Sequence, residues 1–321
     1  MTNFKIIQKR KIWLTISVLL FVVFGLAWMI WGLKYGIDFT GGSLLEIRFL
    51  DNRPDISIIR EELDKIGLKD LIIQPAGEKG LIMRFQDTEE TKHQEVLASL
   101  DKINSVPEEN SGKSTSTVSQ TELTPGLITI EELRYDSVGP SIGQELKRKS
   151  FNAIVFVFTA IVLYITYAFR KVSKPVASWK FGLSALVAMF HDVIITIGVF
   201  AVLGRFFNIE IDTPFVAAVL TVVGYSVHDT IVVFDRIREN LPKSDEDFEG
   251  TVNNSLNQTL VRSINTTLTV ILTLVSIIIF GGASIRTFVL ALTIGIFIGT
   301  YSSIFVASPL VVIWEKWSRK E

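Results

Sequence analysis

The 321-residue sequence contains no cysteine. This absence excludes disulfide bonds, thiolate catalysis and cysteine-ligated metal sites. Histidine is also scarce, with three residues in the chain, and no His-x-x-x-His or His-x-x-Glu spacing occurs. Two His-Asp pairs are present, but adjacent residues on a helix point about 100° apart, so each pair can supply at most one ligand to a shared ion. The sequence therefore argues against an intramembrane metalloprotease, and we expect no metal site.

Hydrophobic and charged residues are both plentiful. Hydrophobic residues make up 48% of the chain and charged residues 20%, which indicates that a membrane portion and a water-exposed portion occupy different stretches. A helix needs about 20 apolar residues to cross a hydrocarbon core of about 30 Å. Six runs meet this requirement, at 12–33, 151–169, 179–203, 214–234, 262–280 and 288–313. We therefore predict an all-α bundle of six transmembrane helices, the last five forming a domain over 150–314.

Basic residues predict the orientation. The first run follows a basic cluster, but it exceeds the apolar core of a typical signal peptide and no small-x-small cleavage site follows, so we expect it to remain as an anchor. Lys and Arg gather beside alternate span ends, near 5–11, 170–174, 236–243 and 316–320. Because cytoplasmic loops carry the excess of Lys and Arg, we place both termini (1–11 and 315–321) and a linker over 235–261 in the cytoplasm. Residues 34–149 then lie outside.

The external segment 34–149 has its own element order. Alternating or helical periodicity predicts a strand at 42–50, a helix at 56–66, a hairpin at 70–74 and 80–85, a helix at 91–103 and a strand at 127–138. The stretch 105–126 is rich in Ser, Thr, Glu, Pro and Gly, which predicts a flexible insertion. The β-α-β-β-α-β order is that of a ferredoxin-like α+β domain, and by itself it implies no function.

Two glycine-rich stretches flank this segment. Gly36-Ile-Asp-Phe-Thr-Gly-Gly42 leaves the first span, and Val138-Gly-Pro-Ser-Ile-Gly143 leads back to the second. Dense glycine indicates positive φ angles or close backbone approach, although a ligand-binding loop is an alternative. We interpret both as domain-membrane junctions, with the candidate residues Gly36, Asp38, Gly41, Gly42, Gly139, Pro140 and Gly143.

Ionisable residues inside the apolar runs are the candidate functional residues. His228 and Asp229 lie within the fourth span and His191 and Asp192 within the third. A charge at membrane depth is costly and is normally kept where it faces a partner or a water-filled path. The pattern favours a proton-handling site, and a structural cluster of interhelical hydrogen bonds is the alternative.

Arg262 lies at the membrane boundary, because the apolar stretch 268–280 alone is too short to span. A guanidinium close to Asp229 would favour the charged acid, whereas burial would favour the neutral acid. A moving helix could therefore switch Asp229 between proton loading and release. In the sixth span, Gly295-x-x-x-Gly299 allows close helix packing, either within the chain or against a partner.

Five stretches together resemble one family. The two glycine-rich junctions, His191-Asp192, the stretch 224–240 and the stretch 257–267 resemble, in order and spacing, the SecF family of bacterial protein-export membrane proteins, within the resistance-nodulation-division superfamily. The resemblance covers nearly the whole chain. It departs from the family at His228, where the family usually has Asn, and in the length of the insertion at 105–126.

The resemblance implies a multi-pass protein of the bacterial inner membrane that is not an enzyme. It implies an accessory Sec translocase subunit that uses the proton motive force to promote preprotein export, with Asp229 and Arg262 as acid and basic partner. Protons are the coupling ion and no cofactor is expected. The implied partners are SecD, the SecYEG channel with SecA, YajC, YidC, an unfolded preprotein and membrane lipids, with no nucleic acid.

Two other functions stay open at this point. The same residues could drive a self-sufficient exporter of small molecules or lipids, although such an exporter should need a larger, ligand-lined cavity than the external domain suggests. The chain could also be a structural scaffold of the translocase without proton flux. The scaffold predicts normal export when Asp229 is neutralised.

Overall fold

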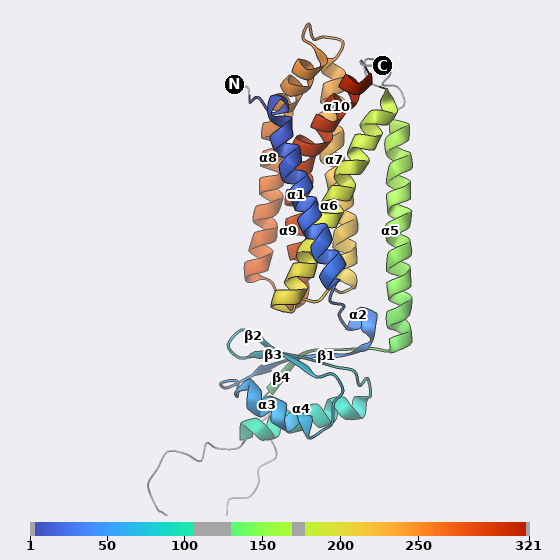
Figure 1. Ribbon diagram of the computed structural model, residues 1–321. Helices are drawn as coiled ribbons and strands as arrows, with labels where there is room; N and C mark the ends of the chain where they lie inside the picture. The colour runs from blue at the N-terminus through green and yellow to red at the C-terminus, as the bar shows by residue number, and fades with distance from the viewer. Residues whose placement is uncertain (1–3, 106–129, 169–176, 319–321) are drawn as a thin grey trace, which may run out of the picture. The chain divides into compact units, whose positions relative to one another are not determined.

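The computed structural model describes residues 4–105, 130–168 and 177–318 (Figure 1). It divides into two compact units, a helical bundle of Met1–Tyr35 with Arg148–Glu321 and an α+β unit of Gly36–Lys147. The predicted insertion at 105–126 lies outside the described residues except for Ser105, which ends a helix. Each unit is described in turn.

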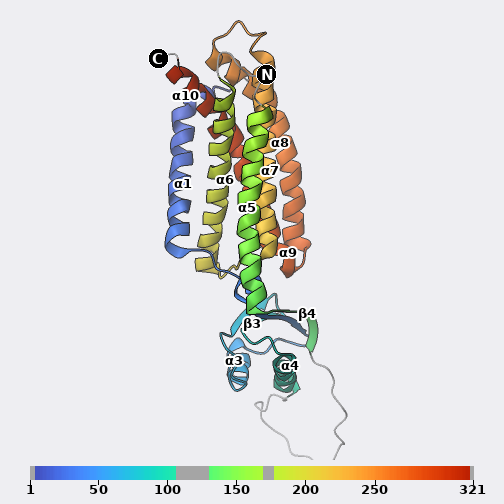
Figure 2. The ribbon, with the colours of Figure 1, turned by 90° about the vertical axis from the view of Figure 1, so that its right-hand side faces the viewer.

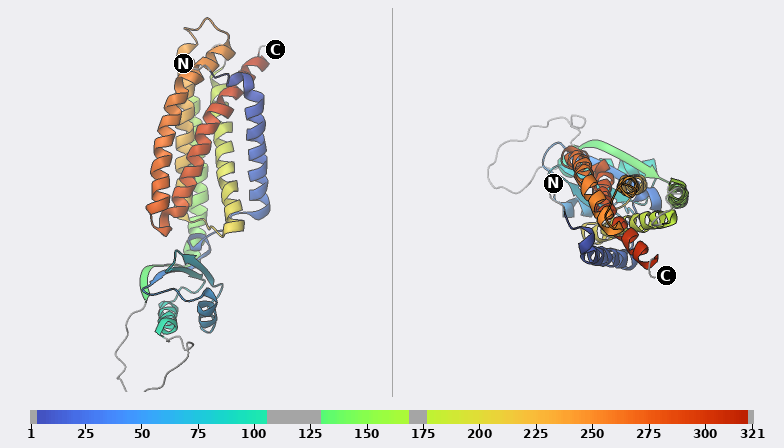
Figure 3. Two further views of the ribbon diagram at one scale, coloured as in Figure 1. Left: turned by 90° about the vertical axis from the view of Figure 1, so that its left-hand side faces the viewer. Right: turned by 90° about the horizontal axis from the view of Figure 1, so that it is seen from above.

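Among the described residues, six helices are long and apolar enough to cross a membrane, as predicted. A short 3-10 turn, η1 (Ile7–Lys9), precedes the first, and a π-helical segment, η2 (Ser303–Ala307), joins α9 to α10 within the sixth. The helices are α1 (Arg10–Trp31), α5 (Pro140–Ala168), α6 (Ser178–Phe207), α7 (Thr213–Asn240), α8 (Phe248–Phe280), α9 (Ala283–Ser302) and α10 (Ser308–Ser318). Figure 3 shows α8 and α9 side by side along the bundle, where the two helices are in contact.

The segment predicted as a linker over 235–261 is helical at both of its ends. Helix α7 continues to Asn240 and α8 already begins at Phe248. Asp247 caps α8 by accepting a hydrogen bond from the Gly250 amide at 2.8 Å, an interaction that stabilises a helix N-terminus. Hydropathy detects only the apolar part of a long helix, so the predicted span begins at residue 262 and leaves the polar first turns of α8 in the linker segment.

These polar turns of α8 hold the N-terminal segment of the chain. The Asn253 Oδ1 atom accepts hydrogen bonds from the backbone amides of Ile6 at 3.0 Å and Ile7 at 3.2 Å. Asn257 accepts from the Phe4 amide at 2.8 Å and donates to the Phe4 carbonyl at 3.0 Å. The backbone of residues 4–7 is therefore held in place, because the side-chain amides of Asn253 and Asn257 satisfy backbone hydrogen-bonding groups that precede α1.

Glu249 adds a charged connection at the same end of the bundle. Its Oε1 atom lies 2.7 Å from the Arg10 guanidinium of α1, and its Oε2 atom pairs with Lys316 of α10. Burial opposes ionisation of this carboxyl, but two cationic partners favour its charged form. One side chain of α8 therefore connects the first and last helices.

The α+β unit has one four-stranded sheet, with all neighbouring strands antiparallel in the order β2-β3-β1-β4. Figure 2 shows α3 and α4 on one face of the sheet. After the short α2 (Ile37–Thr40), the elements follow as β-α-β-β-α-β, the order expected from the sequence. They are β1 (Gly42–Phe49), α3 (Ile56–Asp64), β2 (Ile72–Ala76), β3 (Gly80–Phe85), α4 (Glu90–Ser105) and β4 (Ile130–Val138).

Alternation along the strands builds the core of this unit. Leu45, Ile47 and Phe49 of β1 are fully buried, and they share a cluster with Ile59 and Leu63 of α3. Side chains two residues apart lie on the same face of a strand, so one face of β1 is apolar. The sheet therefore has a single helix-covered core.

Candidate functional site

Asp192 is a fully buried acceptor at the centre of the helical bundle. Its Oδ2 atom accepts hydrogen bonds from Ser226 of α7 at 2.5 Å and from Ser302 of α9 at 2.7 Å. The Nδ1 atom of neighbouring His191 lies 2.9 Å from Oδ1. Three partners on three helices satisfy this carboxylate, so Asp192 joins α6, α7 and α9 through hydrogen bonds.

Asp229 of α7 is also buried, with 8% of its surface exposed, but it is incompletely paired. Its Oδ1 atom accepts a hydrogen bond from Ser263 of α8 at 2.7 Å. Its Oδ2 atom is buried and has no hydrogen-bond partner within residues 4–105, 130–168 and 177–318. A charged oxygen without a donor is costly to bury, whereas a proton on that oxygen removes the charge. A proton or a hydrogen bond from a donor such as water would satisfy this oxygen.

Hydroxyl groups lie between the two acids. Thr230 Oγ1 donates to the Ser226 carbonyl at 3.1 Å and lies 2.8 Å from the Ser303 hydroxyl. Ser303 opens the π-helical segment η2, a distortion that is frequent at functional sites. We call this set the polar seam, and its members are Asp192, Ser226, Asp229, Thr230, Ser263, Ser302 and Ser303.

The two glycines of α9 let α7 approach the polar seam closely. A Cβ atom on Gly295 would lie 2.2 Å from Val222 Cγ2. One on Gly299 would lie 3.1 Å from Ser226 Cβ and 3.7 Å from Asp192 Oδ2. The sequence left open whether these glycines pack within the chain or against a partner. The structure shows that they pack within the chain, where α9 contacts α7. Gly299 in particular keeps space beside the Asp192 carboxylate.

The structure does not bring Arg262 to Asp229. Arg262 is exposed, and its side chain forms no ion pair or hydrogen bond with the part of the chain that is described. Its neighbour Ser263 points inward and contacts Asp229 instead. Adjacent helical residues point about 100° apart, so only one of the two can face the acid. His228 is likewise exposed, on the face of α7 next to Asp229.

The predicted junction residues lie together in the α+β unit. Gly41 has a φ of +79°, and a Cβ atom there would lie 2.8 Å from Pro140 Cα. A Cβ atom on Gly143 would lie 3.1 Å from the Gly41 amide nitrogen, so the two stretches touch. Gly42 also has a positive φ, of +123°. These conformations favour glycine.

The remaining junction candidates lie at or just before the start of a helix. Gly36 is the N-cap of α2 and Asp38 lies in its first turn. Pro140 is the first residue of α5, where a missing amide hydrogen costs nothing. A Cβ atom on Gly139 would meet no atom within 4 Å, so this glycine is not required by close packing.

Sequence reasoning missed the hydroxyl residues of the polar seam. Candidate positions in the sequence were selected by charge. Ser226 and Ser302 instead contact Asp192 through neutral hydroxyl groups, and the Ser303 hydroxyl donates to the Ser226 carbonyl. Ser226 and Thr230 are four residues apart on the same helix as Asp229, and this spacing was the available signal.

Comparisons with known proteins agree with one another. The model of the protein export membrane protein SecD/SecF C-terminal family matches residues 119–317, and that of the SecD/SecF GG motif matches residues 32–49. A protein translocase subunit SecF from Thermobaculum terrenum is 42% identical, over 97% of this chain and 93% of its own length. A SecF from Anaerolinea thermophila is 37% identical, over 97% of this chain and 94% of its own length.

A solved structure is similar over the same range. The crystal structure of SecDF, a translocon-associated membrane protein from Thermus thermophilus, superposes with a TM-score of 0.78 at 32% sequence identity. The match covers 98% of this chain and 39% of the SecDF chain. The chain therefore spans well under half of that larger protein.

Proposed function

Since the chain belongs to the SecF family of protein translocase subunits, we propose that it couples proton movement through the bundle to preprotein export, together with a SecD partner. It is an accessory subunit of the Sec translocase and a transport component. Protons are the coupling ion in this proposal, and the proton motive force across the bacterial inner membrane supplies the energy.

The observation that carries the proposal is the incompletely paired carboxylate of Asp229. One oxygen is held by Ser263 and the other is buried without a donor among the described residues. Such a group can take up and release a proton with a large change in electrostatic energy, because the surroundings do not satisfy its charge. Asp192, with three donors, is suited to a positioning role, since it fixes Ser226 and Ser302 beside the route.

The exposed face next to Asp229 supports the SecD partnership. His228 and Arg262 lie exposed on neighbouring helices that are long and apolar enough to cross a membrane. Charged or titratable groups facing lipid are costly, so a protein partner is the better occupant of this face. The matching SecDF chain extends well beyond the matched 39%, which leaves length for a SecD part within that protein. In our proposal the Arg262 side chain contacts the partner near Asp229. Its positive charge favours the ionised form of Asp229 after each proton transfer.

The proposed orientation places both termini in the cytoplasm and residues 34–149 outside, because Lys and Arg cluster on one side of the spans.

We assign the α+β unit to the ferredoxin-like class on its element order and strand order. The SecYEG channel, SecA, YajC and YidC are proposed partners, and an unfolded preprotein is the proposed cargo.

The test is gradient-dependent export in vesicles carrying Asp229→Asn, at equal expression and with SecD present. Asp235→Asn is the matched control, because Asp235 lies on the same helix and is exposed. We expect Asp229→Asn to remove the gradient-dependent part of export while the complex still assembles, and Asp235→Asn to leave it intact. Unchanged export in the Asp229 variant would refute the proton role and favour a scaffold.

A further inference from the structure

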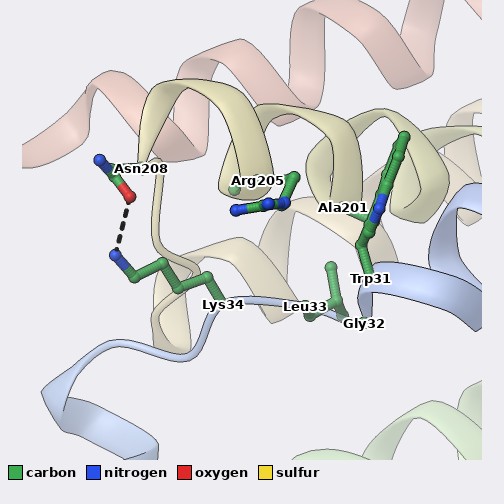
Figure 4. Close-up of a pocket in the computed structure, with 8 residues that line it drawn as sticks. Trp31, Gly32, Leu33, Lys34, Ala201, Arg205 and Asn208 are labelled. Carbon is green, nitrogen blue, oxygen red and sulfur yellow. Dashed lines mark hydrogen bonds between the residues drawn. The ribbon is translucent and has the colours of Figure 1, made fainter.

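A cavity lies between the last residue of α1 and the last turns of α6, apart from the polar seam (Figure 4). Its volume is about 320 Å³, within the size range of ligand sites in proteins. Six of its lining residues carry the argument, namely Trp31, Leu33, Lys34, Gly204, Arg205 and Asn208.

Backbone contacts build the walls of this cavity. The Ile211 amide donates to the Lys34 carbonyl at 2.8 Å, which ties the segment after α1 to the loop after α6. Asn208 ends α6 in the left-handed conformation, with a φ of 54°. A Cβ atom on Gly204 would lie 3.2 Å from both Lys34 Cβ and the Ile209 carbonyl, so glycine permits the close approach of the two segments.

The charge in the cavity is positive and incompletely neutralised. Lys34 is already engaged, with its Nζ atom 3.2 Å from Asn208 Oδ1 and 3.5 Å from Glu210 Oε1. Arg205 is exposed and forms no ion pair or hydrogen bond with any described residue. Figure 4 shows its side chain between Lys34 and the Trp31 ring. The Arg205 guanidinium, which carries five N–H donors, therefore has no acceptor among the described residues.

Trp31 lines the cavity beside the charge, and two exposed phenylalanines follow Arg205 in the sequence. Trp31 packs edge-on against Phe206, with ring centroids 5.3 Å apart. Phe206 is 64% exposed and Phe207 is 70% exposed. Trp residues at the ends of membrane-spanning helices lie at the level of the lipid headgroups. Because Arg205 is two residues from the end of α6, we expect its guanidinium at the depth of lipid phosphates.

We propose that this cavity binds the phosphate group of a membrane phospholipid, with Arg205 as its ligand and the acyl chains against Trp31 and Phe206. Arginine suits a phosphate because its planar donors match two oxygens at once. Glu210 neutralises Lys34, so Arg205 supplies the attraction for one anion. Both leaflets contain phospholipids, so the site requires neither the proposed orientation nor the proton coupling.

The test is phospholipid retention by the purified full-length protein in detergent, measured by native mass spectrometry during titration with phosphatidylglycerol. We compare wild type with Arg205→Gln, Arg205→Lys and the control Arg286→Gln. Arg286 is also an exposed arginine, near the start of α9. Loss of a charge-assisted contact should weaken retention about tenfold in Arg205→Gln. Arg205→Lys should retain more lipid than Arg205→Gln, and Arg286→Gln should match wild type.

Two further arms identify the ligand. Diacylglycerol lacks the phosphate and should not compete, and inorganic phosphate lacks the acyl chains and should not displace the lipid at equal concentration. Equal retention by Arg205→Gln and wild type would overturn the proposal, as would equal binding of diacylglycerol. Displacement by inorganic phosphate would reassign the cavity to a soluble anion. All variants are first checked for wild-type thermal unfolding.

Discussion

Replacing Gly295 by alanine should separate α9 from α7. The new methyl carbon would lie 2.2 Å from one methyl carbon of Val222 and 2.6 Å from the other, whereas contacting carbons lie about 3.5–4.0 Å apart. Valine in a helix has one strongly preferred rotamer, so Val222 cannot turn aside without strain. Relief of the clash requires the two helices to move apart by more than 1 Å, because the carbons would be 2.2 Å apart and need about 3.5 Å.

The expected magnitude follows from two opposing effects. Overpacking in a close-packed interior costs about 1–3 kcal/mol, while replacing glycine in a helix gains about 0.5–1 kcal/mol. We expect Gly295→Ala to lose about 1–2 kcal/mol of unfolding free energy as the balance of the two. The measurement is reversible unfolding of the purified protein in mixed micelles, followed by tryptophan fluorescence.

The control is Gly224→Ala on the facing helix, where a Cβ atom would meet nothing within 4 Å. This variant should be as stable as wild type or slightly more stable. The double variant Gly295→Ala with Val222→Ala should recover most of the clash energy, with a coupling energy of about 1–2 kcal/mol. If Gly295→Ala unfolds like Gly224→Ala, or if the double variant shows no coupling, the inferred contact is wrong.

Two other predictions concern carboxylates in the two units. Asp192→Asn should lower the unfolding free energy by about 1–3 kcal/mol more than Asp229→Asn, because hydrogen-bond partners hold both oxygens of Asp192 but only Oδ1 of Asp229. Equal losses in the same unfolding assay would contradict this. Hydrogen bonds from the Ser57 hydroxyl and amide hold the pKa of Asp55 below its usual range, so this carboxylate stabilises α3 above an unfolded-state pKa of about 3.9, and the stabilisation disappears as pH falls through the lowered value. The stability difference between wild type and Asp55→Ala should therefore be larger at pH 7 than in strong acid, and a difference that does not change with pH would refute the assignment.

Hydrophobic patterns predicted most of the fold. Each of the six apolar runs overlaps an observed span, although 12–33 extends past Trp31 and 151–169 extends past Ile165. The strand alternation around Leu45 and Ile47 matches the buried face of β1. The patterns failed where a helix is polar. The first turns of α8 are stabilised by Asp247 and by amide contacts with the N-terminal segment, and neither interaction leaves a hydropathy signal.

The candidate site was predicted in part. Charged residues inside apolar runs identified Asp192 and Asp229, because burying a charge requires a reason. Spacing along one helix could not show that Ser263 rather than Arg262 faces Asp229, since that choice depends on the rotation of α8 about its axis. The Gly295 and Gly299 pair indicated close packing, but only the tertiary structure shows Val222 and Ser226 as its partners.

The attachment of the N-terminal segment to α8 has a consequence for biogenesis. Phe4, Ile6 and Ile7 bond to side chains that follow them by 246 to 253 positions. A ribosome adds residues at about 5–20 per second, so Asn253 and Asn257 emerge many seconds after the first helix. During that interval the segment has no α8 to bind. Final locking of the first helix must therefore wait until Asn253 and Asn257 have been synthesised, and a chain truncated before Asn253 should leave residues 4–7 open to proteases.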